Sequence, residues 1–177
     1  MITGRPGRRG AVAAGALLGL AALAAPELNR PAPRLLWNAS ASLPIGLYRV
    51  DPGGRAGLGR TVVYRPTSAQ ASLLAARGYL PEDVPLLKRV AAGEPSVVCR
   101  RGLDVFIDGR LAARARPADR AGRILPAWSG CRRLGATEVF LLAPAAPDSF
   151  DSRYIGPVSR ARIVGPATPL WLPGAPR

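Results

Sequence analysis

Residues 84–113 read VPLLKRVAAGEPSVVCRRGLDVFIDGRLAA and hold the clearest structural pattern in the chain. Short apolar and β-branched runs are separated there by Gly, Pro and Asp, as is typical of strands and tight turns. Asp108-Gly109 has the composition of a two-residue hairpin turn, and it lies between Val105–Ile107 and Arg110–Ala113. The pattern predicts antiparallel strands that follow one another closely.

Similar short runs extend outward on both sides of this stretch. A single helix also fits the chain, with Thr67 or Ser68 as its N-terminal cap. Ala69–Arg77 would fill this helix and Gly78 would end it. The basic stretch 110–133 would leave the sheet as an excursion. Many short strands with one helix predict a mainly β, antiparallel domain. The expected strands are Gly46–Val50, Thr61–Tyr64, Leu86–Val90, Ser96–Arg100, Val105–Ile107, Arg110–Ala113, Val139–Leu142 and Arg160–Val164.

The composition is that of a globular protein and excludes several kinds of site. The chain has 177 residues, of which 48% are hydrophobic and 20% charged, and this suits one domain with or without a tether. It has no histidine and only two cysteines. A Ser-His-Asp or Cys-His nucleophile, a His-ligated zinc site and a four-cysteine metal site are therefore excluded. We expect no metal and no cofactor.

The net charge is +14, and every basic residue except Lys88 is an arginine. More than half of the chain is Ala, Gly, Pro or Arg, and the arginines stand in ones and twos, as in Arg8-Arg9. They form no basic stripe interleaved with aromatic residues. We therefore expect a solvated basic surface that suits anionic lipid, and no nucleic-acid partner.

The N-terminus has the pattern of a membrane-targeting segment. Arg5, Arg8 and Arg9 precede an uncharged run at residues 11–25, which reads AVAAGALLGLAALAA. As a helix this run would rise about 22 Å, short of a ~30 Å hydrocarbon core, and its neighbours bring it to the lower limit for a span. A retained anchor, a cleaved signal peptide and a soluble segment are the alternatives, of which we favour the anchor.

We therefore predict a signal-anchor or transmembrane segment at residues 1–26, a Pro-rich linker at 27–36 and an exported domain at 37–177. The N-terminal arginines would stay in the cytoplasm, and the domain would face the periplasm. In that oxidising compartment Cys99 and Cys131 would form a disulfide, which would restrict the unfolded chain by roughly 3–4 kcal/mol. Two unpaired buried cysteines are the alternative.

Because histidine is absent, a serine or threonine nucleophile would need a lysine as its base. Lys88 lies in the apolar run Val84–Ala92, and burial there would lower its pKa toward neutrality. An arginine cannot take this role, because its pKa stays above about 12. The alternative is an edge-strand lysine whose amine reaches water.

Two polar clusters complete the candidate site. Ser40 and Ser42 stand in a turn-like stretch, where alternation would put them on one face, so that one attacks and the other donates to an oxyanion. A polar turn without function is the alternative. Ser149, Asp151 and Arg153 also alternate in sequence, and we interpret Asp151 and Arg153 as a local structural ion pair.

Together these residues resemble the conserved boxes of the type I signal peptidases, which are Ser/Lys serine endopeptidases. The similarity is greatest to the conjugal-transfer TraF-type branch, and it spans residues 37 to about 164. The boxes that carry it are Ser40-Ala41-Ser42, Leu87-Lys88-Arg89-Val90, Ser42-Leu43-Pro44-Ile45-Gly46-Leu47-Tyr48 and Ser149-Phe150-Asp151-Ser152-Arg153-Tyr154-Ile155-Gly156-Pro157-Val158.

The resemblance implies a role for each candidate residue. Ser42 would be the nucleophile and Lys88 its general base. Ser40 would donate to the oxyanion beside the Ser42 backbone N–H, and Ser149 would orient the lysine. The residues that would brace the site are Asp151 and Arg153. The implied fold is an antiparallel β catalytic core with a small inserted cap, preceded by one N-terminal membrane helix.

The resemblance further implies a serine endopeptidase anchored in the inner membrane, which acts in the periplasm on exported precursors with small residues before the scissile bond. In the TraF-type branch the substrate is the pilin of a conjugative type IV secretion system, and its own N-terminal amine captures the acyl-enzyme to give a cyclic product. The alternatives are plain leader-peptide hydrolysis and a non-catalytic basic scaffold of the conjugation apparatus. The oligomeric state is not specified by the sequence.

Overall fold

The computed structural model describes residue 10, residues 12–20 and residues 32–173. By its internal contacts the chain divides into two units, Met1–Ala32 and Pro33–Arg177. In the first unit, residue 10 and residues 12–20 are helical and exposed.

No helix among the described residues has both the length and the apolar character needed to cross a membrane. The predicted membrane segment at 1–26 and the linker at 27–36 lie largely outside the described residues. Both remain predictions.

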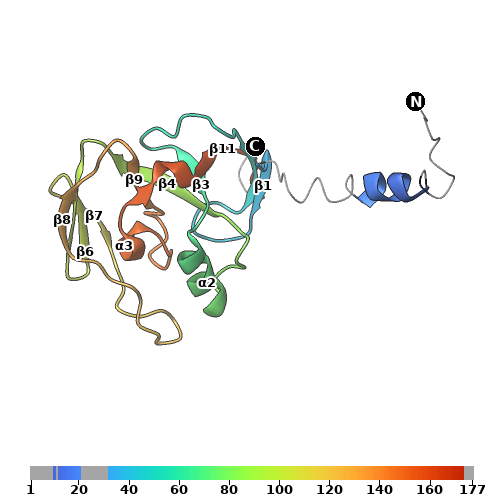
Figure 1. Cartoon of the computed structure of the whole chain (residues 1–177). Helices are drawn as coiled ribbons and strands as arrows, with labels where there is room; N and C mark the ends of the chain where they lie inside the picture. Colours follow the sequence, from blue (N-terminus) through green and yellow to red (C-terminus); the bar gives the residue numbers. More distant parts are fainter. Residues whose placement is uncertain (1–9, 11, 21–31, 174–177) are drawn as a thin grey trace, which may run out of the picture. The chain divides into compact units, whose positions relative to one another are not determined.

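The second unit is built on a seven-stranded antiparallel sheet with the order β1-β2-β11-β3-β4-β9-β10 (Figure 1). β11 lies between β2 and β3, so the last strand of the domain is paired with two of its first strands: Ala167 pairs with Val50, and Pro166 pairs with Val62. The mainly β, antiparallel fold predicted from the sequence is confirmed. The strands are β1 (Leu35–Asn38), β2 (Gly46–Val50), β3 (Thr61–Tyr64), β4 (Leu86–Gly93), β9 (Glu138–Leu142), β10 (Val158–Ser159) and β11 (Ile163–Trp171).

A second, four-stranded sheet is inserted between β4 and β9, with the order β7-β6-β5-β8. Its strands are β5 (Val97–Arg101), β6 (Asp104–Ile107), β7 (Arg110–Arg114) and β8 (Gly130–Arg133). Cys99 of β5 lies opposite Cys131 of β8, and the two form a disulfide. The expected excursion at residues 110–133 is in part wrong, because it begins and ends with strands of this sheet.

Two short helices flank the sheets. α2 (Ser68–Ala76) has Thr67 as its N-cap, and the Thr67 side chain accepts a hydrogen bond from the Gln70 backbone N–H in a capping box. It ends before Gly78, whose φ of 67° is a conformation that glycine adopts readily. α3 (Ser152–Ile155) and a 3₁₀ turn, η1 (Arg160–Arg162), lie between β9 and β11.

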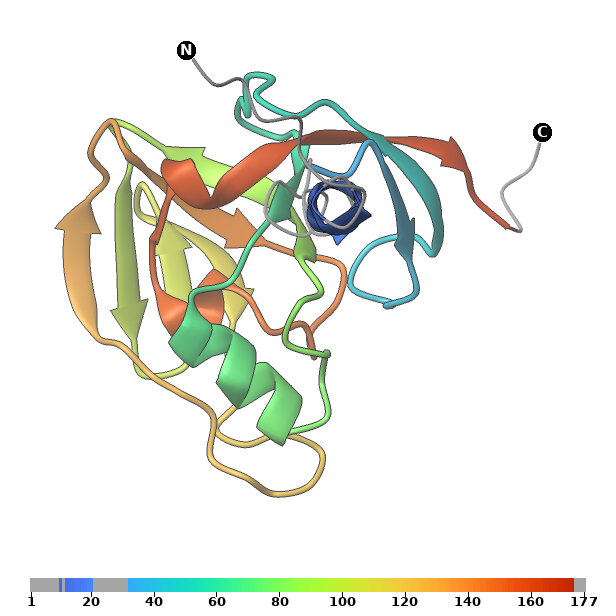
Figure 2. The same ribbon diagram turned by 45° about the vertical axis from the view of Figure 1, so that its right-hand side comes forward.

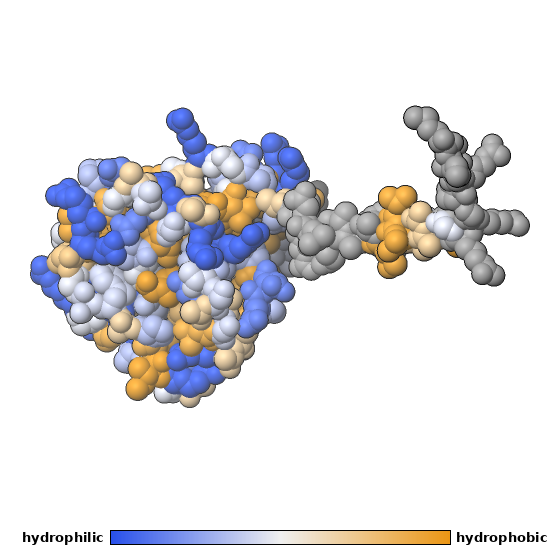
Figure 3. All heavy atoms as spheres, viewed as in Figure 1, coloured by the Kyte–Doolittle hydropathy of each residue, from blue (hydrophilic) through white to orange (hydrophobic). Residues whose placement is uncertain are grey.

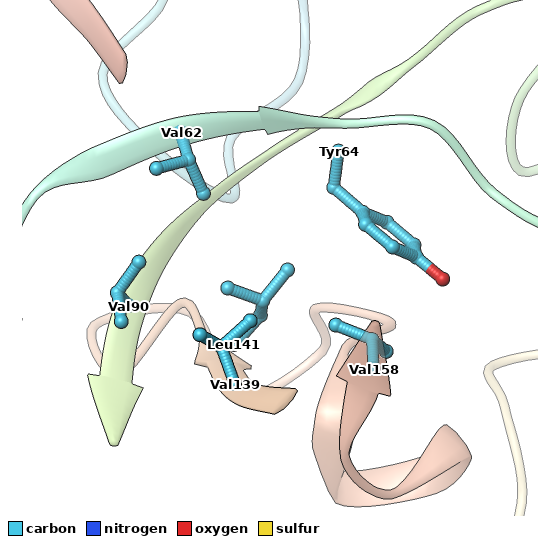
Figure 4. Close-up of a cluster of buried hydrophobic side chains, with 6 residues drawn as sticks. All are labelled: Val62, Tyr64, Val90, Val139, Leu141 and Val158. Atoms are coloured by element: carbon cyan, nitrogen blue, oxygen red, sulfur yellow. The ribbon is translucent and has the colours of Figure 1, made fainter. Parts of the chain in front are cut away.

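Clusters of buried apolar residues hold the sheet together. In one cluster Val62, Val90, Leu141 and Val158 converge from four different strands (Figure 4). A second cluster combines residues of both sheets: Ala92, Val98, Val105, Leu134, Phe140 and Leu142. β4 contributes to both clusters, so its backbone is a rigid support for any side chain that it carries.

On the face shown in Figure 3, hydrophilic residues are spread among apolar ones and do not gather on one element. Whether the basic surface meets lipid stays a prediction, as does the expectation of no nucleic-acid partner.

Candidate active site

Lys88 lies on β4, where it pairs with Val62 of β3 and is 3% exposed. Because side chains alternate along a strand, Lys88 shares its face with Leu86 and Val90. Leu87 packs into a separate core cluster on the opposite face. The sheet therefore carries the lysine amine into an apolar environment.

Burial and one hydrogen bond determine the chemistry of this amine. Lys88 Nζ donates to Ser149 Oγ at 2.8 Å. Removal from water disfavours the charged form, and it lowers the pKa of Lys88 from 10.5 to about 8. The Asp151 carboxylate opposes this shift, and the Arg153 guanidinium adds to it. Near pH 8 much of Lys88 is therefore neutral and able to accept a proton.

Asp151 and Arg153 form a buried ion pair that shapes the loop carrying Ser149. Arg153 Nη2 lies 2.8 Å from Asp151 Oδ2, and Arg153 Nη2 also donates to the carbonyl oxygen of Ala146 at 2.7 Å. Asp151 Oδ2 accepts from the backbone N–H of Ala143 at 2.9 Å. The backbone N–H of Ser149 in turn donates to the Ala146 carbonyl at 3.1 Å. The predicted ion pair is present, and it fixes the backbone from which Ser149 reaches Lys88.

Ser40 and Ser42 lie in the loop between β1 and β2, and not on a strand. Side-chain alternation therefore does not explain their placement, and that part of the prediction is wrong. Ser42 is half-buried, while Ser40 is exposed and its Oγ donates to Asn38 Oδ1 at 3.1 Å. The hydroxyl proton that was expected to reach an oxyanion is directed at Asn38 in this structure.

One cavity of about 880 Å³ brings the candidate residues together. Ser40, Ser42, Lys88 and Ser149 line it, whereas the two residues of the buried ion pair do not. Within the described part of the chain, no hydrogen bond joins Ser42 Oγ to Lys88 Nζ. Catalytic hydrogen bonds often tighten only when substrate is present. The candidate nucleophile and base thus line the same cavity.

The rest of the cavity wall is largely apolar, with charged groups from the long loop between β7 and β8. This loop passes beside α2 (Figure 2), where Tyr79 Oη donates to Asp119 Oδ2 at 2.5 Å. Arg116 and Arg120 of the same loop form ion pairs with Asp148. The apolar wall includes Leu74, Leu80, Leu86, Leu125 and Phe150. The cavity therefore offers both apolar and polar contacts to a ligand.

Two buried residues that support the site were missed by the sequence analysis. Asn38 is hydrogen-bonded to the Ser40–Ser42 loop, and an asparagine before a serine-rich turn is a recognisable signal for such contacts. Arg100 is 3% exposed, and its Nη1 donates to the Arg153 carbonyl at 2.6 Å. Nothing in the sequence separates this buried arginine from the exposed Arg101 beside it.

Comparison with known proteins adds an independent result. The chain matches the family described as signal peptidase, peptidase S26, over residues 8–171. It is 32% identical over 143 residues to a plasmid transfer protein TraF of Escherichia coli, and this match covers 75% of this chain and 80% of that protein. A second Escherichia coli protein of the same name is 38% identical over 81 residues, covering 44% and 46% of the two chains.

Among solved structures, a signal peptidase I from Enterococcus faecalis has a TM-score of 0.38 at 18% identity, covering 64% of this chain and 97% of that chain. The family match of residues 8–171 includes every residue of the candidate site. The chain therefore belongs to the signal peptidase family, peptidase S26, and has TraF plasmid transfer proteins among its relatives.

Proposed function

We propose that this protein is a membrane-anchored serine endopeptidase that cleaves exported precursors through an acyl-enzyme on Ser42, with Lys88 as the general base. The observation that carries the proposal is the buried Lys88 amine, which has a pKa of about 8, is hydrogen-bonded to Ser149 and lines the same cavity as Ser42. A base for a serine hydroxyl needs a pKa near the working pH.

Cleavage would begin when neutral Lys88 takes the hydroxyl proton of Ser42 as its Oγ attacks the carbonyl carbon of the scissile bond. The backbone N–H of Ser42 would stabilise the oxyanion, together with the Ser40 hydroxyl once this turns away from Asn38. The C–N bond then breaks, and the Lys88 ammonium returns its proton to the leaving amine. An ester between Ser42 Oγ and the acyl part of the substrate remains.

The second half of the reaction releases this ester. Lys88 would take a proton from the incoming nucleophile, which attacks the ester carbonyl, and would return the proton to Ser42 Oγ as the ester bond breaks. If the nucleophile is water, the product is a linear peptide. If the nucleophile is the substrate's own N-terminal amine, the product is cyclic, and its mass is lower than that of the linear peptide by one water molecule.

The proposed substrate is the pilin precursor of a conjugative type IV secretion system. The support is the name of the two Escherichia coli relatives, plasmid transfer protein TraF, and the extent of the match to the first of them. The proposed arrangement is an anchor at residues 1–26 in the inner membrane, a linker at 27–36 and a peptidase domain at 37–177 in the periplasm. Small residues before the scissile bond are expected in the substrate.

The test is to express the full chain with the candidate precursor and to measure the precursor's mass. The wild type should convert it, and Ser42→Ala should not, because the attacking atom is gone. Ser129→Ala is a matched control, since Ser129 is exposed and does not line the cavity. Full conversion by folded Ser42→Ala would contradict the mechanism. A folded wild type that leaves the precursor intact would favour the non-catalytic scaffold.

A further inference from the structure

The side chain of Asn38 is bonded to both limbs of the loop that carries Ser42. Asn38 is the last residue of β1 and is 6% exposed. Its Nδ2 donates to the carbonyl oxygens of Ser40, Leu43 and Pro44, each at 3.0 Å. Its Oδ1 accepts from the backbone N–H of Ser40 at 3.2 Å and from Ser40 Oγ at 3.1 Å. One amide therefore contacts the loop before and after the nucleophile.

The loop depends on this amide because its own backbone gives it little support. Within the described part of the chain, no backbone–backbone hydrogen bond joins two residues of the segment 39–45. β1 and β2 fix only the two ends of the loop, where Asn38 pairs with Gly46. The Asn38 carboxamide takes the place of the missing backbone hydrogen bonds. It holds the backbone before Ser42, at Ser40, and the backbone after it, at Leu43 and Pro44.

We propose that Asn38 is a positioning residue for the nucleophile, which aims Ser42 into the cavity and holds the Ser40 hydroxyl beside it. This inference rests on the proposed function. Only an amide offers both two N–H donors and an acceptor oxygen in so short a side chain. An aspartate would set a carboxylate against the three carbonyl oxygens. A small displacement of a reacting atom is enough to cost about a hundredfold in rate.

Tyr48 provides a matched control, because its hydroxyl is hydrogen-bonded to the same loop at Pro44 and not to Ser40 or Ser42. Tyr48 Oη donates to the Pro44 carbonyl at 2.7 Å, and this carbonyl also accepts from Asn38. Tyr48 does not line the cavity. Tyr48→Phe removes one hydrogen bond of the loop and leaves every contact of Ser40 in place.

The experiment measures kcat, KM, the pH profile and the unfolding temperature of the full-length wild type, Asn38→Asp, Asn38→Ser and Tyr48→Phe on one precursor. Asn38→Asp should lower kcat about 10- to 100-fold and change KM less than about threefold. In Asn38→Ser, which adds no charge to the cavity that Asn38 and Lys88 both line, the apparent pKa of the rate should stay that of the wild type. In Asn38→Asp the added carboxylate should favour protonated Lys88 and raise this pKa, so kcat is compared on the plateau above it. Tyr48→Phe should keep kcat within about twofold of the wild-type value. This should hold even if its unfolding temperature falls as far as that of Asn38→Asp.

Several results would overturn the proposal. One is an Asn38→Asp protein that keeps more than about half of the wild-type kcat per folded molecule. Another is an equal loss of kcat in Tyr48→Phe. If Asn38→Asp does not fold, Asn38→Ser decides, and failure of both to fold would make Asn38 a residue of the fold alone. Absence of Ser42-dependent cleavage in the wild type would instead overturn the proposed function, and this assignment with it.

Discussion

Burial of Lys88 costs folding free energy whenever its amine is protonated. The pKa of this amine falls from 10.5 to about 8 on folding, which corresponds to roughly 3 kcal/mol. Below about pH 8 the whole cost is present. Between about 8 and 10.5 the unfolded chain binds more protons than the folded one, so stability rises with pH. Above 10.5 the cost has disappeared, and a protein working near neutral pH therefore retains this lysine at the expense of stability.

The same shift predicts how activity depends on pH. The rate of the wild type should rise about tenfold per pH unit and level off near pH 8, where Lys88 loses its proton. Lys88→Arg should be folded and inactive at every pH, because a guanidinium keeps its proton at any pH that the folded protein tolerates. Initial rates of precursor cleavage between pH 6 and 10, with circular dichroism of the variant, check both statements. More than about a tenth of wild-type turnover in Lys88→Arg would remove Lys88 from the mechanism.

At the scale of the elements, the buried ion pair at the start of α3 fixes the loop behind Lys88. Arg153→Met leaves the Asp151 carboxylate buried without its partner, and it should destabilise the fold by about 3–5 kcal/mol. Urea unfolding followed by tryptophan fluorescence measures this difference. Arg120→Met is the matched control, because Arg120 pairs with Asp148 at the surface and its loss should change little. Equal effects of the two changes would contradict the role given to the buried pair.

The elements differ in how well the sequence predicts them, and the reason is physical. β2 and β3 have the predicted bounds, because Val and Tyr alternate or cluster there between Gly and Pro. β8 reads GCRR and is exposed along its whole length, so no hydrophobic pattern marks it. Its place depends on pairing with β5, and that pairing is a long-range contact.

The residues of the candidate site also differ in how well the sequence predicts them. Lys88 with a serine nucleophile was predicted because the absence of histidine leaves few residues able to supply a base. The roles of Ser42 and Ser149 were predicted from the resemblance to the type I signal peptidases. Asn38 was not predicted, although an asparagine before a serine-rich turn is a local signal for its contacts. Arg100 was not predicted because its importance depends on a distant hydrogen-bond acceptor. Arg100 reaches the Arg153 carbonyl across 53 positions of sequence, and no local pattern specifies such a contact.

At the scale of the whole molecule, the described core belongs to one unit. All of the buried apolar clusters lie within Pro33–Arg177, and both sheets contribute to one of them. The disulfide between Cys99 and Cys131 also lies in this unit. Its stability should therefore come from its own packing.

This division predicts the behaviour of a chain that begins at Pro33. It should unfold at the temperature of the full chain and cleave detergent-solubilised precursor with the same kcat, because the core and the candidate site are complete. It should no longer sediment with vesicles of zwitterionic phosphatidylcholine. Anionic lipid is avoided because the chain, with a charge of +14 over its full length, is basic enough to bind it without an anchor.

A full-length variant with Leu17→Arg and Leu18→Arg tests the anchor without changing the length of the chain. Both leucines are exposed on the helix of residues 12–20, so their replacement should leave the domain folded while placing two charges in the apolar run. Like the shortened chain, the variant should no longer sediment with the vesicles, and it should keep the kcat of the wild type. If the shortened chain still sediments, the domain itself binds the membrane. If the full chain does not, residues 1–26 are no anchor, and attachment to the membrane must be dropped from the proposed function.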